Sequence, residues 1–152
     1  MLAVDDVRGD IPDLAAQQAA VVDWAAARTS AGRVFVCPTY FSDDPLLDRL
    51  FGARPARYLE HLGAALDRRI RVYWTGAEIC AKAIEPTHIE GVAERLGRAP
   101  VIWDNAAAND SPVMARHLTL RAITGRPAEL ACAFRRMRPG VSAEFAHPVR
   151  VA

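Results

Sequence analysis

The sequence predicts an α/β fold built on a parallel β-sheet, and three observations lead to that prediction. Short apolar runs typical of strands alternate with longer segments whose apolar residues recur at helical spacing. The strand-like runs are rich in β-branched and aromatic residues, as are strands that are buried on both faces. Each of the first four runs ends in polar residues, and parallel strands joined by right-handed crossovers bring such ends to one side of a sheet.

The first predicted strand covers residues 2–4 and leads directly into Asp5 and Asp6. A helix over 12–28 follows, because Pro suits a first helical turn and the apolar residues then repeat at helical spacing. Trp24 is expected on or near the buried side of this helix, where packing in the core is its expected role.

The second predicted strand covers residues 34–36 and ends at Pro38, because proline cannot continue a central ladder. Two helical pieces are expected next, over 45–51 and 55–66, with Gly52 between them.

The third predicted strand covers residues 70–74 and ends at a Thr-Gly pair. A short helical piece over 77–82 and a clear helix over 86–96 follow, and Gly97 is a suitable stop for the latter. The fourth strand covers 100–103 and ends in a polar cluster.

The last part of the chain predicts two more helices, over 111–123 and 127–137. The tail over 139–152 has no strong period, although a short strand around 142–145 fits its composition. The whole chain, 1–152, is expected to form one domain, with 139–152 as its tail or last strand.

Composition excludes several classes of function. The 152 residues are 51% hydrophobic, which is enough for a core, and a net charge of +1 without a basic tract gives no sign of nucleic-acid binding. No signal peptide opens the chain, and no apolar run approaches the length of a membrane span. Its three cysteines are widely spaced and form neither a disulfide framework nor a CxxC metal pattern. We therefore expect a soluble protein of a reducing, cytoplasmic compartment.

Asp5 and Asp6 are the chemically most informative pair. Taken alone, two adjacent carboxylates are more typical of a solvated turn or a helix cap. Three further polar strand ends, at Thr39-Tyr40, Thr75-Gly76 and Asp104-Asn105, are expected on the same side of the sheet. Neighbouring acids at such a place repel each other and have pKa values that burial drives apart, which suits general acid/base catalysis.

The ordered motifs of the chain resemble those of a known family. They are Leu2-Ala3-Val4-Asp5-Asp6-Val7, Cys37-Pro38-Thr39-Tyr40, Tyr73-Trp74-Thr75-Gly76, Ala81-Lys82-Ala83-Ile84-Glu85-Pro86, Val101-Ile102-Trp103-Asp104-Asn105 and Asn109-Asp110. Together they resemble the catalytic barrel of glycoside hydrolase family 84. This family contains β-N-acetylglucosaminidases, among them protein O-GlcNAcase and bacterial hyaluronidase-like enzymes.

This resemblance implies a (β/α)₈ TIM barrel of which the chain matches only the second half, starting at the strand that carries Asp5 and Asp6. The family's first strands, with a lysine that holds the sugar, have no counterpart here. Such a half barrel would leave two sheet edges open. We therefore expect that the chain is unstable alone, associates with itself or with a chain that supplies the missing half, or is a truncated form of a longer enzyme.

The resemblance also implies a retaining, substrate-assisted hydrolysis through an oxazoline, with no cofactor and no metal. In this scheme Asp5 accepts the acetamido N–H and Asp6 is the general acid and base. Tyr40, Trp103, Asn105 and Asp110 would bind the acetamido group and the sugar, although core or turn roles fit Tyr40, Trp103 and Asn105 too.

One departure from the family concerns the stretch Phe134-Arg135-Arg136-Met137-Arg138-Pro139, where an arginine stands in place of a sugar-binding asparagine. The implied function is hydrolysis of N-acetylglucosamine-containing glycans or glycoproteins, with little or no activity from this chain alone. The alternative is a non-catalytic remnant, a half-barrel module that binds sugars or associates with a partner.

Overall fold

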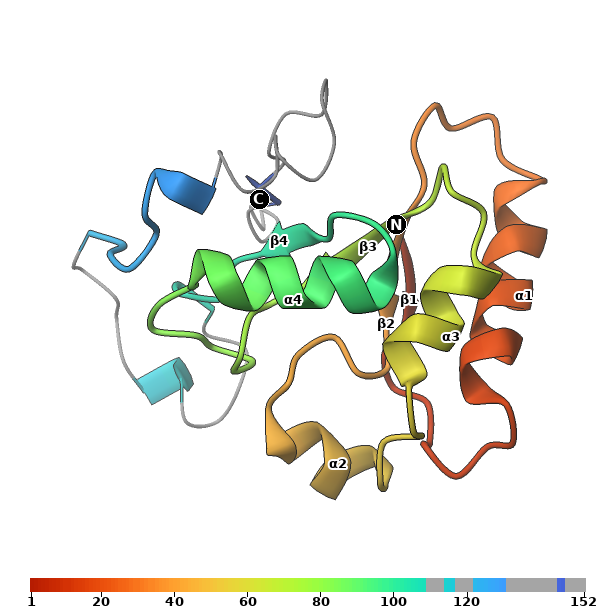
Figure 1. The fold of residues 1–152 in the computed structure, drawn as a ribbon, viewed down its shortest axis with the longest axis horizontal. Helices are drawn as coiled ribbons and strands as arrows, with labels where there is room; N and C mark the ends of the chain where they lie inside the picture. The colour runs from red at the N-terminus through yellow and green to blue at the C-terminus, as the bar shows by residue number, and fades with distance from the viewer. Residues whose placement is uncertain (109–113, 117–121, 131–144, 147–152) are drawn as a thin grey trace.

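The computed structural model describes residues 1–108, 114–116, 122–130 and 145–146 (Figure 1). Its centre is a five-stranded sheet in the order β1-β2-β3-β4-β5, in which all neighbouring strands are parallel. The strands are β1 (Leu2–Val4), β2 (Phe35–Pro38), β3 (Arg71–Trp74), β4 (Val101–Trp103) and β5 (Phe145–Ala146). Because the strand order never reverses, the sheet is of the barrel type and not of the doubly wound type.

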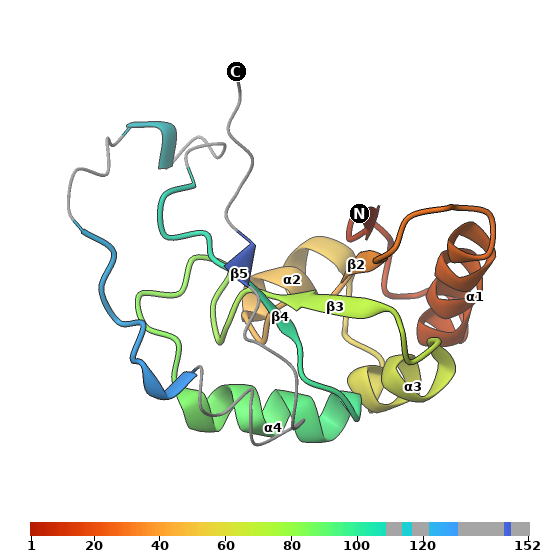
Figure 2. The same ribbon diagram turned by 90° about the horizontal axis from the view of Figure 1, so that it is seen from above.

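Four α-helices of the described residues connect or flank these strands, and a 3₁₀ helix lies between β4 and β5 in the chain. They are α1 (Leu14–Ala26), α2 (Pro45–Phe51), α3 (Tyr58–Ala65), α4 (Pro86–Leu96) and the 3₁₀ helix η1 (Met114–Arg116). Helices α1, α3 and α4 lie in a row on the same side of the sheet, with α3 packed between the other two (Figures 1 and 2). This is the arrangement of a barrel segment, in which helices cover the outer face of the strands.

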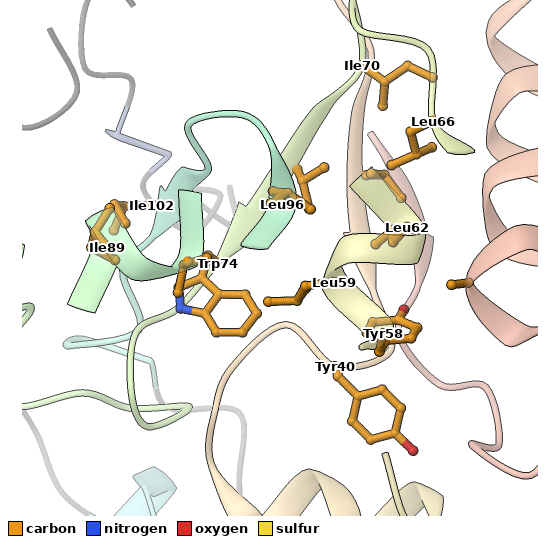
Figure 3. Packing of buried hydrophobic residues seen from close by; sticks show 14 of the residues in the cluster. Tyr40, Tyr58, Leu59, Leu62, Leu66, Ile70, Trp74, Ile89, Leu96 and Ile102 are labelled. Atoms are coloured by element: carbon orange, nitrogen blue, oxygen red, sulfur yellow. The ribbon is translucent and has the colours of Figure 1, made fainter. Parts of the chain in front are cut away.

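The core lies between this row of helices and one face of the sheet (Figure 3). Because strand side chains alternate between faces, every second residue points toward the helices. The strand residues that are wholly buried in the core are Val36, Val72, Trp74 and Ile102, and the helices contribute Leu59, Leu62, Ile89 and Leu96.

The other face of the sheet carries a row of aromatic rings. Phe35 stacks on Tyr73 with ring centroids 5.4 Å apart, and Tyr73 meets Trp103 edge to face at 5.0 Å. The rings come from β2, β3 and β4, so they tie three strands together on the face that would point inward in a closed barrel.

Two local predictions are wrong. Residues 77–82 form bends and turns instead of a helix, because this loop is bonded to its neighbours: the Thr75 hydroxyl donates to the Glu78 carbonyl at 3.2 Å. Trp24 is 60% exposed and is covered by the Arg28 guanidinium, 4.2 Å from its ring centroid. It lies off the buried stripe of α1, which is formed by Leu14, Ala15, Gln18, Ala19 and Val22.

The ends of the sheet are open within the described residues. β1 and β5 are the edge strands, and no further described strand pairs with either of them. The predicted helices over 111–123 and 127–137 lie mostly outside the described residues, as does most of the tail over 139–152. Among the helices that the structure describes, none has the length and apolar character needed to span a bilayer.

Candidate active site

Asp5 and Asp6 follow the last residue of β1, as the sequence predicts. Asp5 is half-buried and Asp6 is exposed. Adjacent side chains diverge at a strand end, so the two carboxylates face different surroundings. Ala3 pairs with Cys37 in the register of β1 and β2, and Asp5, two residues after Ala3, continues on the same face.

A cavity of about 520 Å³ opens at this end of the sheet. Asp5, the residue after β1, lines this cavity. Trp103, the last residue of β4, and Asn105, two residues later, line it from the other side of β2 and β3 in the sheet order. Its further walls come from the loops after β2 and β3, and the side chains that complete it include Cys37, Phe41, Asp44, Thr75, Glu78, Ile79 and Cys80. The structure therefore brings three of the predicted site residues together in one concave, mostly apolar pocket.

The amide of Asn105 is held in a fixed orientation. Trp103 Nε1 donates to Asn105 Oδ1 at 2.7 Å, and Asn105 Nδ2 donates to the Ile79 carbonyl at 2.9 Å. Since an amide nitrogen carries two hydrogens, one N–H of Asn105 is left for a ligand. Asn105 lies in the wall of the cavity.

Tyr40 is not part of this cavity. Its side chain is fully buried, its hydroxyl donates to the Gly52 carbonyl at 2.7 Å, and its ring meets Tyr58 edge to face (Figure 3). The next residue, Phe41, lines the cavity instead.

Three residues of the cavity wall, Asp44, Glu78 and Cys80, belong to none of the motifs quoted above. Asp44 accepts from the Leu46 amide at 2.9 Å and from the Ile79 amide at 3.2 Å, so it caps α2 and joins two loops of the cavity wall. Glu78 and Cys80 belong to the segment 77–82, for which the sequence predicts a helix. Because of that wrong prediction, neither residue is among the predicted site residues. Cys37 and Thr75 belong to the motifs quoted above, and the alternation of strand residues places both on the inner face of the sheet.

Burial perturbs two titratable groups in the cavity. Removal from water raises the pKa of Asp5, and the neighbouring Asp6 charge adds to the increase. Burial also raises the pKa of Cys37 to about 12, with the carboxylates of Asp5 and Asp6 as further causes. The Cys37 thiol therefore remains protonated near neutral pH, which argues against a cysteine nucleophile at this place.

An ion pair between Asp104 and Arg126 holds the residue that follows β4. Asp104, only 7% exposed, accepts two hydrogen bonds of 2.7 Å from the Arg126 guanidinium. The Asp104 carboxylate raises the pKa of Arg126. Arg126 also donates to the carbonyls of Ala81 and Lys82, both at 2.9 Å, so the pair ties β4 to the loop after β3.

Asp110 lies outside the described residues, as does the arginine-containing stretch over 134–139, and both remain predictions from the sequence. Within the described part of the chain, no group of three His, Cys, Asp or Glu side chains is placed to hold a metal ion.

Comparison with known proteins agrees with this geometry. The family model for beta-N-acetylglucosaminidase matches residues 6–141. Protein O-GlcNAcase of Rattus norvegicus is 42% identical over 73 residues, which span 48% of this chain and 8% of the rat protein.

Solved structures give the same result for the fold. A mutant of the Thermobaculum terrenum O-GlcNAc hydrolase matches with a TM-score of 0.62 and 30% identity, covering 77% of this chain and 24% of that one. The structure of CpGH84B matches with a TM-score of 0.55 and 20% identity over 71% of this chain and 19% of its own, and it supports the fold alone. The chain thus spans a minor part of each of these relatives.

The parallel sheet in sequential order and the helices on one face are those of a partial TIM barrel, and the family model covers most of the chain. This chain therefore belongs to the β-N-acetylglucosaminidases of glycoside hydrolase family 84.

Proposed function

We propose that this chain carries the acetamido-binding and acid/base part of a β-N-acetylglucosaminidase active site. The observation that carries the proposal is the shared cavity of Asp5, Trp103 and Asn105, at the carboxyl ends of β1 and β4. Active sites of TIM barrels are built at this end of the strands. Trp103 offers an apolar wall, and the carboxylate and amide offer an acceptor and a donor for an acetamido group.

The proposed reaction uses the substrate as its own nucleophile. The acetamido carbonyl oxygen attacks the anomeric carbon, the glycosidic C–O bond breaks, and Asp6 gives its proton to the leaving oxygen. Water then opens the resulting oxazoline, and Asp6 takes up a proton from it, which restores the enzyme and retains the configuration.

Asp5 has a different part in this scheme. Its carboxylate accepts the acetamido N–H and stabilises the positive charge that develops on the ring of the oxazoline. Because Asp5 is partly removed from water, its interaction with that charge is stronger than in bulk solvent. Asn105 would donate its remaining amide N–H to the acetamido oxygen, and Asp110 would bind sugar hydroxyls.

The substrate class that we propose is β-linked N-acetylglucosamine on a glycan or a glycoprotein. The rat relative, named Protein O-GlcNAcase, supports the glycoprotein as the carrier. The edge of β1, with which no further described strand pairs, supports a partner, a second copy or another chain, that adds parallel strands and covers Asp6. The thiol of Cys37, which forms no disulfide, suits the reducing compartment, the cytoplasm, that we propose for the protein.

Calorimetric titration with N-acetylglucosamine-thiazoline, which resembles the oxazoline intermediate, tests the proposal. We expect saturable binding to the chain that Asn105→Ala abolishes and that Asp10→Asn, an exposed control, preserves. Absence of heat at millimolar ligand would refute an acetamido site. A fluorogenic β-N-acetylglucosaminide then separates the two functional classes: turnover that Asp6→Asn removes indicates an enzyme, and binding without turnover indicates a sugar-binding module.

A further inference from the structure

Three buried polar side chains meet at the end of β1. They come from three different elements: Gln18 from α1, Thr39 from the residue after β2, and Tyr58 from α3. Their exposed fractions are 4%, 0% and 2%, so all of them lie inside the apolar core. Gln18 and Thr39 both donate to one backbone group, the carbonyl oxygen of Val4, and Tyr58 donates to Gln18.

The bonds satisfy every polar group of Gln18. Its Nε2 donates to the Val4 carbonyl at 2.7 Å and to Thr39 Oγ1 at 2.7 Å, and its Oε1 accepts from the Tyr58 hydroxyl. The Thr39 hydroxyl, which accepts from Gln18, donates in turn to the Val4 carbonyl at 2.9 Å. The Val4 oxygen thus receives two side-chain hydrogen bonds.

The network lies where β1 and β2 end side by side, since Val4 pairs with Pro38 in their register. A leucine at position 18 and a valine at position 39 would fill similar volume without the cost of burying polar groups. The role of the network is therefore to fix the peptide group that joins Val4 to Asp5, since two of its hydrogen bonds end on the Val4 carbonyl.

That peptide is a rigid plane, so the direction of the Val4 C=O also sets the direction of the Asp5 N–H and Cα. We propose that Gln18 and Thr39 are positioning residues of the site: by holding the Val4 carbonyl they aim the Asp5 carboxylate into the cavity. This role in turnover rests on the proposed function, while the orientation of Asp5 can be measured without it.

Four single variants test the proposal. Gln18→Leu removes both donors to Val4 and Thr39, and Thr39→Val removes one hydroxyl while Gln18 still reaches the carbonyl. Thr39→Ser keeps the hydroxyl. Gln17→Leu is the matched control, because Gln17 is the exposed neighbour on α1 and donates to the Pro12 carbonyl at 2.8 Å.

The first readout is the pKa of Asp5, followed by carboxyl ¹³C NMR in each folded variant. Freed from the network, the end of β1 admits water, and the pKa of Asp5 is expected to fall toward its ordinary value in Gln18→Leu and Thr39→Val. It should stay at the wild-type value in Thr39→Ser and Gln17→Leu. Should Gln18→Leu fail to fold, the contrast between Thr39→Val and Thr39→Ser decides the matter.

The second readout is turnover of a fluorogenic β-N-acetylglucosaminide. Misorientation of the Asp5 carboxylate in Gln18→Leu and Thr39→Val is expected to lower kcat by about tenfold to a hundredfold, with a smaller change in KM. Absence of turnover agrees with the little or no activity expected of this chain alone, and the NMR comparison then decides the positioning role. Folded Gln18→Leu and Thr39→Val proteins with the wild-type Asp5 pKa would overturn the positioning role.

Discussion

Replacing Arg126 by methionine removes the partner of a buried carboxylate and tests how the end of β4 is held. Asp104 is 7% exposed, and the Arg126 side chain is 14% exposed. Arg126→Met keeps much of the side-chain volume but removes both hydrogen bonds of 2.7 Å from the guanidinium to the Asp104 carboxylate, while the Ala106 amide still donates to its Oδ1 at 2.9 Å.

The expected loss follows from the burial of this pair. Removing one partner of a buried ion pair costs about 3–5 kcal/mol. One side of the Arg126 guanidinium reaches exposed carbonyls, which water can solvate in the variant, so we expect the lower end, about 3 kcal/mol. For a protein of this size each kcal/mol moves the melting temperature by about 2–4 °C, which gives a decrease of about 6–12 °C.

Urea unfolding followed by circular dichroism measures this loss directly. Arg69→Met is the matched control, since the Arg69 side chain is 89% exposed and pairs with Asp67 on the surface; no change beyond experimental error is expected. The double variant Asp104→Asn/Arg126→Met should recover part of the loss, because it also removes the buried negative charge that Arg126 neutralises in the wild type. If Arg126→Met unfolds at the same urea concentration as Arg69→Met, the ion pair between Asp104 and Arg126 does not stabilise the end of β4 in solution.

Two further predictions concern packing and charge. An alanine Cβ at position 63 would lie 2.0 Å from the Leu96 carbonyl, so Gly63→Ala should push α3 off α4 and cost about 1–3 kcal/mol. Gly91→Ala, with no atom within 4 Å of the added Cβ and inside α4, should instead stabilise by about 0.5–1 kcal/mol; equal unfolding midpoints would contradict this. Burial raises the folded-state pKa of Asp5, so its carboxylate costs stability once pH exceeds the ordinary value of 3.8. Asp5→Asn should therefore be more stable than wild type at pH 7 and equal to it well below pH 3.8; a less stable variant at pH 7 would show that the Asp5 charge is stabilised in the fold.

Hydrophobic patterning was sufficient for the regular elements. Helices α2 and α4 have the predicted bounds, because Pro at the first turn and Gly just beyond the end mark them. The loop over 77–82 has helix-forming residues, yet side-chain bonds from Thr75 and Asn105 to its carbonyls hold it as turns. The bond from Asn105 joins residues 26 positions apart, and such a long-range contact leaves no local signal in the sequence.

The site was predictable to the extent that it depends on strand ends. Asp5, Trp103 and Asn105 share a cavity because parallel strands end on one side of the sheet. Sequence could not decide which of two adjacent aromatic residues faces the cavity: Tyr40 is drawn into the core by the Gly52 carbonyl, and Phe41 lines the cavity instead. The buried network around Gln18 is also invisible in the pattern, since a glutamine in a helix usually faces solvent.

The most direct test of the acetamido site is an NMR titration of the ¹⁵N-labelled chain with N-acetylglucosamine-thiazoline. The largest shift changes should occur at the backbone amide of Asp5, the Trp103 indole N–H and the Asn105 side-chain amide, and all three should saturate with one dissociation constant. The account is contradicted if these signals stay in place while the ligand is in excess, or if the changes cluster at the second cavity near Leu14, Pro55 and His61.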